Sequence, residues 1–127
     1  MGFRLDLHSG VPFYRQIIDQ VLVAIASGVL KSGDQLPTVR QVAVDLSINP
    51  NTVMRAYREM EIRGILATQQ GTGTFITPQK VEPDEAERSR RLGTLVSELV
   101  ARAGSQGFSV QEIHEAIGEL MKESQRR

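Results

Sequence analysis

The chain has 127 residues, enough for one compact domain or for a small domain with a helical extension. Hydrophobic residues make up 40% and charged residues 24%, as in an ordinary globular protein, and the formal net charge of zero does not mark a strongly basic nucleic-acid binder. No cysteine is present, which excludes disulfides, thiolate metal sites and thiol nucleophiles.

The first predicted helix covers about residues 12–27. Its apolar residues recur every four positions from Phe13 to Ile25, which predicts a buried stripe along one side of the helix. Pro12 suits the first turn of a helix, and Gly28 is typical of the position just after its end.

A turn-rich connector at residues 31–37 leads to a short predicted helix at residues 39–46. Thr38 and Gln41 have the spacing of a capping box, in which the side chain of each residue accepts a hydrogen bond from the backbone N–H of the other. The apolar residues of this helix recur at the spacing of a single helix face, so we expect one side of it to be buried.

A tight turn separates this helix from a third predicted helix at about residues 50–63. Asn49 is a typical N-cap, Pro50 suits the first helical position, and Gly64 marks the end of the helix. Two helices joined by a short turn, the second opening with polar residues, form the helix-turn-helix pattern.

After the third helix the hydrophobic period changes to that of strands. Strands are predicted at residues 65–69 and 74–77, and the turn at residues 70–73 joins them. A hairpin in this place makes a helix-turn-helix winged. We therefore predict a winged helix-turn-helix DNA-binding domain over residues 1–78.

Residues 79–127 are predicted to form a second, helical domain. Its charge-dense start is interpreted as a linker that becomes helical at about Asp84, and a break at residues 104–107 ends this helix. Ser109 and Glu112 have capping-box spacing at the start of the last predicted helix.

Each of these two helices carries one apolar stripe, and a lone pair of helices cannot bury both stripes well in water. We expect the stripes to pair with a second copy of the chain; the alternative is that both helices pack on the chain's own first domain. The fold class is thus mostly α with a small β-hairpin, a winged helix-turn-helix followed by a two-helix C-terminal dimerisation unit. The residues assigned to dimerisation are Leu92, Leu95, Val96, Leu99, Val100, Ile113, Ile117, Leu120 and Met121.

The third predicted helix offers side chains that can read DNA. Asn51, Arg55 and Arg58 fall on one face of this helix. Asn49 and Thr52 lie near its N-terminus. Asn can make two hydrogen bonds to adenine, Arg can make two to guanine, and Thr can contact a thymine methyl group. The same residue types are common on a solvated helix face, so the pattern alone leaves both interpretations open.

Two further sites flank this helix. Arg40 can hold a phosphate or reach a base edge, or else form a surface ion pair with Asp45. The turn at residues 70–73 is either a wing tip, whose glycines let the backbone approach DNA closely, or no more than a hairpin turn. The residues assigned to DNA contact are Thr38, Arg40, Asn49, Asn51, Thr52, Arg55, Arg58, Gly71, Thr72 and Gly73.

Four segments resemble the GntR family of bacterial regulators in their order and spacing, within about residues 10–77. They are Leu36-Pro-Thr-Val-Arg40, Asn49-Pro-Asn-Thr-Val-Met-Arg-Ala-Tyr57, Glu61-Ile-Arg-Gly-Ile-Leu66 and Gly71-Thr-Gly-Thr-Phe75. The pattern of the second segment and the short C-terminal part are similar to the YtrA-type branch, in which that part is a two-helix dimerisation domain. Many family members carry Arg where this chain has Pro50 and Met54.

The resemblance implies a transcriptional regulator, a repressor that binds an inverted repeat of double-stranded DNA as a homodimer in the cytoplasm and controls a transporter operon. It also implies that Arg40 and the opening turns of the third helix contact the operator, and that Gly71 and Gly73 lie in the wing. A small-molecule effector at the dimer interface or beside the winged domain is compatible with this organisation.

No group of residues predicts catalysis, a cofactor or a metal site. The two histidines, His8 and His114, lack partners at metal-ligand spacing, and no apolar run approaches the roughly 20 residues of a membrane helix. Two rival functions are a winged-helix module that binds proteins rather than DNA, which the neutral charge favours, and a fragment of an enzyme fused to a GntR-type region, which the capped final helix disfavours.

Overall fold

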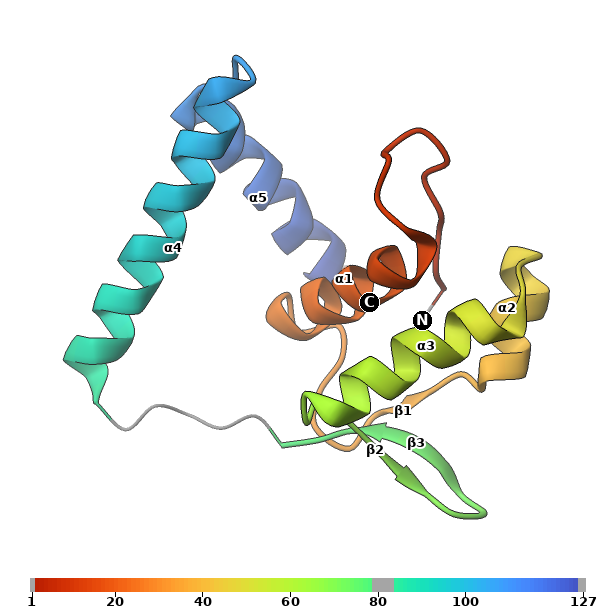
Figure 1. Cartoon of the computed structure of the whole chain (residues 1–127). Helices are drawn as coiled ribbons and strands as arrows, with labels where there is room; N and C mark the ends of the chain where they lie inside the picture. The colour runs from red at the N-terminus through yellow and green to blue at the C-terminus, as the bar shows by residue number, and fades with distance from the viewer. Residues whose placement is uncertain (1, 79–83, 126–127) are drawn as a thin grey trace. The chain divides into compact units, whose positions relative to one another are not determined.

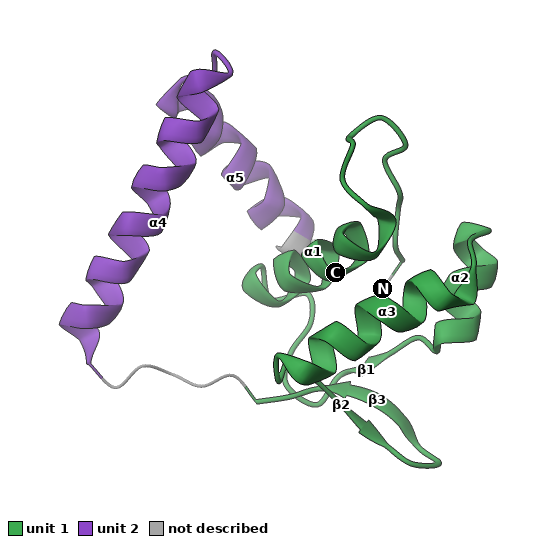
Figure 2. Ribbon diagram, in the orientation of Figure 1, with its two compact units in different colours: residues 1–79 green, residues 80–127 purple. Residues whose placement is uncertain are grey.

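The computed structural model describes residues 2–78 and 84–125 and divides the chain into two compact units (Figures 1 and 2). Unit 1 comprises residues 1–79 and unit 2 residues 80–127, coloured green and purple in Figure 2. Within the described residues the chain forms five helices and one small antiparallel sheet, which confirms the predicted class of a mostly helical winged fold.

Unit 1 contains three helices and the sheet, and the predicted elements are confirmed with ends that differ by no more than one residue. In chain order its elements are α1 (Phe13–Ala26), β1 (Gln35–Leu36), α2 (Val39–Leu46), α3 (Pro50–Ile62), β2 (Leu66–Gln69) and β3 (Gly73–Ile76). Figure 1 shows β2 and β3 as a hairpin that extends away from α3 to a narrow tip.

The sheet has three strands in the order β1-β3-β2, whereas the sequence predicts a hairpin of two. β2 pairs with β3 from Leu66 opposite Ile76 to Gln69 opposite Gly73, and β1 pairs with the other edge of β3. β1 was missed because two residues cannot display a period-two hydrophobic pattern, and Pro37 ends the strand at once.

The core of unit 1 lies between the three helices and the sheet. Ile17 and Val21 of α1 and Val53 and Met60 of α3 are completely buried, because the apolar stripes of these two helices face each other. The buried stripe predicted for the first helix is therefore confirmed. Among the described residues the buried hydrophobic side chains are Ile17, Ile18, Val21, Ala24, Leu30, Leu36, Val42, Ala43, Val53, Ala56, Tyr57, Met60, Ile65, Leu66 and Ile76.

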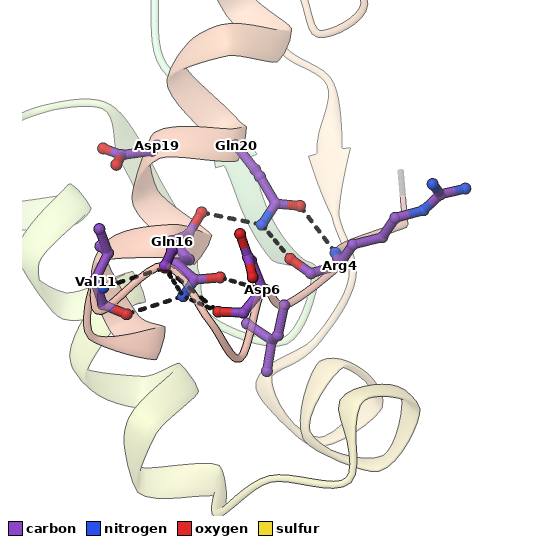
Figure 3. A pocket seen from close by; sticks show the side chains of 8 residues that line it. Arg4, Asp6, Val11, Gln16, Asp19 and Gln20 are labelled. Carbon is purple, nitrogen blue, oxygen red and sulfur yellow. Dashed lines mark hydrogen bonds between the residues drawn. The ribbon is translucent and has the colours of Figure 1, made fainter. Parts of the chain in front are cut away.

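The segment before α1 is held against that helix by two glutamine side chains (Figure 3). Gln20 accepts from the backbone N–H of Arg4 at 2.9 Å and donates to its carbonyl at 2.6 Å. Gln16 does the same for Asp6, at 2.8 and 3.0 Å. Each amide thus pairs with the backbone N–H and carbonyl of one residue, as a neighbouring strand would. The segment belongs to no sheet among the described residues, so these side chains supply its hydrogen bonds.

Unit 2 is a pair of helices, α4 (Glu85–Ser105) and α5 (Val110–Gln125). Asp84 caps α4 by accepting from the backbone N–H of Ala86 at 3.0 Å, and the predicted capping box of Ser109 and Glu112 is present, with both hydrogen bonds at 3.1 Å. The helix runs two residues past the expected end because Gly104 is tolerated in its last turn. The predicted linker at residues 79–83 lies outside the described residues.

Candidate nucleic-acid interface

The turn between α2 and α3 leaves the N-terminal end of α3 accessible. Ser47 ends α2 in the left-handed conformation, with φ of 56°, and the backbone N–H of Ile48 donates to the carbonyl of Ala43 at 3.1 Å. Asn49 then caps α3, because its side-chain oxygen accepts from the backbone N–H of Asn51 at 2.8 Å. The prediction of Asn49 as an N-cap is confirmed. Asn51 contributes only its backbone N–H to this cap.

The predicted reading face of α3 is exposed on the side away from the core. Asn51, Arg55 and Arg58 are exposed, while Thr52 is half-buried. Met54 lies between Asn51 and Arg58 on this face and is 44% exposed. This side of α3 therefore presents two cations, two polar side chains and one apolar side chain to solvent. Side chains of these types can hydrogen-bond base edges or contact a thymine methyl group.

The Arg55 side chain lies against α1 rather than extending freely. Its guanidinium carbon is 3.8 Å from the centroid of the Tyr14 ring. A guanidinium over an aromatic face gains cation–π attraction, worth about 0.5–1 kcal/mol at an exposed site. This contact divides the predicted face into Asn51 and Arg58 on one side and a restrained Arg55 on the other.

Arg40 is exposed in the first turn of α2, beside the Thr38 cap. The capping box is confirmed, because Gln41 N–H donates to Thr38 Oγ1 at 3.1 Å and Thr38 N–H donates to Gln41 Oε1 at 2.9 Å. No ion pair joins Arg40 to Asp45 among the residues that the structure describes. Residues five apart on a helix point about 140° away from each other, which explains why the surface-pair alternative fails and leaves the Arg40 guanidinium available.

The wing tip is held by a residue that sequence reasoning missed. Gln35 of β1 donates its side-chain N–H to the Thr72 carbonyl at 3.0 Å. A β-carbon at Gly73 would collide with that Gln35 amide nitrogen, and φ at Gly73 is 134°, which only glycine adopts readily. Gly71, with φ of 85°, faces open space, so its requirement is conformational alone.

A second set of contacts ties the wing to α3. The Thr68 hydroxyl of β2 donates to Glu61 Oε1 at 2.9 Å and lies 3.3 Å from the hydroxyl of Thr74 on β3. A hollow of about 340 Å³ opens between the start of α2, the exposed side of α3 and these wing threonines. Its lining residues are Val39, Met54, Tyr57, Arg58, Glu61, Thr68 and Thr74.

The buried Tyr57 anchors α3 to the connector before α2. Its hydroxyl donates to the Pro37 carbonyl at 2.6 Å, and burial raises the pKa of this phenol above its usual range. Tyr57 therefore stays a neutral donor, and the contact fixes the start of α2 relative to the recognition face. Unit 1 in this way brings Arg40, the α3 face and the wing into one domain.

Comparison with known proteins identifies this arrangement. The family model described as "Bacterial regulatory proteins, gntR family" matches residues 13–76. The chain belongs to the GntR family. The matched residues run from the first residue of α1 to the last residue of β3, and thus cover the whole winged helix-turn-helix of this GntR protein.

Named relatives extend the similarity into unit 2. The HTH-type transcriptional repressor YtrA of Bacillus subtilis (strain 168) is 34% identical over 117 residues, which cover 92% of this chain and 90% of the relative. A crystal structure titled as a transcriptional antiterminator from Listeria monocytogenes EGD-e has a TM-score of 0.68 at 28% identity and covers 95% of this chain and 93% of that one. YtrA from Sulfolobus acidocaldarius has a TM-score of 0.58 at 31% identity and covers 80% of this chain and 99% of that one.

The family assignment settles the class of activity. This GntR protein is a DNA-binding transcriptional regulator and not an enzyme, as the sequence predicts. Over the described ranges, no three His, Cys, Asp or Glu side chains gather into a metal-binding group, and no helix has the length and apolar character to cross a membrane.

The residues predicted for dimerisation line one side of each helix of unit 2. On α4, Leu92, Leu95, Val96 and Leu99 are exposed by 47% to 62%, and Val100 is half-buried. On α5, Ile113 is half-buried, while Ile117, Leu120 and Met121 are exposed by 41% to 59%. An apolar hollow of about 450 Å³ lies between the helices, with Leu99 and Leu120 among its lining residues. The two helices thus leave their stripes largely in water.

Proposed function

We propose that this GntR regulator is a cytoplasmic repressor that binds an inverted-repeat operator as a homodimer. The observation that carries the proposal is the exposed face at the start of α3, where Asn51, Arg55 and Arg58 stand opposite the core beside the wing. In this proposal α3 enters the major groove, Arg40 and Thr38 contact the DNA backbone, and the wing tip approaches the adjacent groove.

The proposed dimer is supported by the exposed apolar stripes of unit 2. Within residues 84–123 no side chain is buried, although two apolar stripes are present. A helix pair of this size cannot offset its conformational entropy without burying apolar surface. A second copy supplies an equal and complementary stripe, and a two-fold pair of winged domains then matches two half-sites about one helical turn apart.

Repression is proposed from the similarity to a relative named as a transcriptional repressor. A dimer that occupies its operator excludes polymerase from overlapping DNA. Control of a transporter operon is proposed from the family resemblance. A small-molecule effector enters the proposal as a ligand that changes the pairing of the two winged domains, since half-site spacing depends on that pairing.

The test uses the purified full chain and duplex DNA selected from genomic fragments. We expect one enriched inverted repeat, and a Kd that rises steeply with salt because phosphate contacts release counterions. Arg58→Ala is expected to cost about 1–3 kcal/mol and to relax sequence preference at one base pair. Arg63→Ala, at the C-cap position that follows the same helix, is the matched control and should bind as the unmodified protein does.

The opposite result has a defined meaning. If no duplex is enriched and binding does not depend on salt, the protein is a winged-helix module for protein partners, which its net charge of zero favours. If Arg58→Ala and Arg63→Ala weaken binding equally, the assignment of the α3 face is wrong, because a non-specific charge effect explains both.

A further inference from the structure

Among the described residues of the α3 face, Arg55 is the one whose side chain is held by another element. Its guanidinium carbon lies 3.8 Å from the centroid of the Tyr14 ring. Tyr14 is the second residue of α1, is half-buried and packs on the hydrophobic core. The ring is therefore a fixed platform, and the guanidinium that stacks on it is restrained in place.

Stacking leaves the hydrogen-bonding edges of Arg55 available. The five N–H donors of a guanidinium point outward in its plane, whereas the Tyr14 ring covers one face. Within residues 2–78 and 84–125 the Arg55 side chain has neither an ion pair nor a hydrogen bond. The result is an oriented planar cation suited to an anion that offers two oxygens.

The position of the stack favours the DNA backbone over the bases. Glu59, one turn after Arg55, lines a polar hollow together with Tyr14, so this side of α3 faces α1. A guanidinium drawn toward α1 lies at the edge of the α3 face, while Asn51 and Arg58 remain nearer its centre. When a helix lies in the major groove, the phosphates stand along its edges and the base edges lie beneath its centre.

We propose that Tyr14 is a positioning residue that holds the Arg55 guanidinium for a phosphate of the bound duplex. The proposal rests on the proposed function, in which α3 enters the major groove. A free arginine side chain loses rotamer freedom when it binds, and a guanidinium already stacked has less freedom to lose. Tyr14 thus contributes to DNA affinity through Arg55, without contacting a base.

The experiment is a double-mutant cycle in the full chain, read as Kd on the selected operator and on an unrelated duplex of equal length. Arg55→Ala should weaken binding to both duplexes and lower the salt slope by about one, because one phosphate contact is lost. Tyr14→Leu should weaken binding about two- to fivefold, and should have no further effect when Arg55 is already Ala. Tyr14→Phe keeps the ring and should bind within about twofold of the unmodified protein.

Three results overturn the proposal. If the effects of Tyr14→Leu and Arg55→Ala multiply, the two residues act independently. If Arg55→Ala relaxes preference at one base pair and leaves the salt slope unchanged, Arg55 reads a base. Arg55→Lys keeps the charge and loses the planar stack, so binding equal to that of the unmodified protein also contradicts the role of stacking, even where Tyr14→Leu does not fold. If the unmodified protein binds no duplex at all, the proposed function itself has failed.

Discussion

The two units of this protein differ in how far they bury their apolar residues. Unit 1 encloses a core in which Ile17, Val21 and Met60 are inaccessible to solvent, and the Tyr57 hydroxyl ties α3 to the connector before α2. Unit 2 has strong helix signals and capped ends, yet Leu92 and Leu95 remain more than 60% exposed. Unit 1 therefore has the contacts of an independent domain, whereas unit 2 leaves apolar side chains exposed that the proposed dimer would bury.

The largest effect is expected in the core of unit 1. Met60→Ala removes a completely buried side chain from α3 and should lower the free energy of unfolding by about 2–5 kcal/mol. Ile62→Ala is the matched control on the same helix, because Ile62 is 79% exposed, and should change that free energy by no more than about 0.5 kcal/mol. Denaturant unfolding measures both free energies. An equal decrease in the two variants would contradict the assignment of Met60 to the core.

The next effect concerns association through unit 2. Leu99→Asp places a charge in the α4 stripe and should raise the dimer dissociation constant by about a hundredfold or more, since an unpaired charge would have to be desolvated in the interface. Ala101→Asp, on the solvated side of α4, is the control and should leave association unchanged. Sedimentation equilibrium measures the constant. Equal behaviour of the two variants would mean that the stripe does not pair.

A smaller effect is expected at the wing. Gln35→Ala removes the hydrogen bond to the Thr72 carbonyl, and the freed wing tip should weaken DNA binding by about 0.5–1.5 kcal/mol, with little change in sequence preference. Gln35→Glu cannot donate that hydrogen bond and should weaken binding at least as much. Binding of both variants at the unmodified affinity would mean that the wing tip does not contact DNA or needs no support from β1.

Much of the fold could be predicted because each helix carries its own signals. The Thr38 box, the Asn49 cap and four-residue apolar spacing are local, and they place helix ends within a residue in unit 1. β1 could not be predicted, because its two residues become a strand only by pairing with β3. The role of Gln35 in holding the wing tip could not be predicted for the same reason, since its partner Thr72 is 37 residues away.

The exposure of the α3 face could be predicted from the sequence, but the contacts of that face with other elements could not. The i, i+4, i+7 spacing correctly placed Asn51, Arg55 and Arg58 on the exposed side of α3. The same spacing carries no information on α1, so the Tyr14 stack under Arg55 was missed. Tyr14 lies beside the buried stripe of its helix, where an aromatic residue is ordinarily interpreted as part of the core.

The proposal that unit 2 pairs the chains while unit 1 binds DNA is tested most directly by two molecular masses. They are the mass of the free protein and the mass of its complex with the selected operator, both at micromolar concentration. We expect a dimer in both states, two chains per duplex, and a shift of Leu99→Asp to monomers that bind a single half-site weakly. A monomer in solution that binds as one chain per duplex, with the same affinity in Leu99→Asp, would contradict the claim that unit 2 pairs the chains for unit 1 to read DNA.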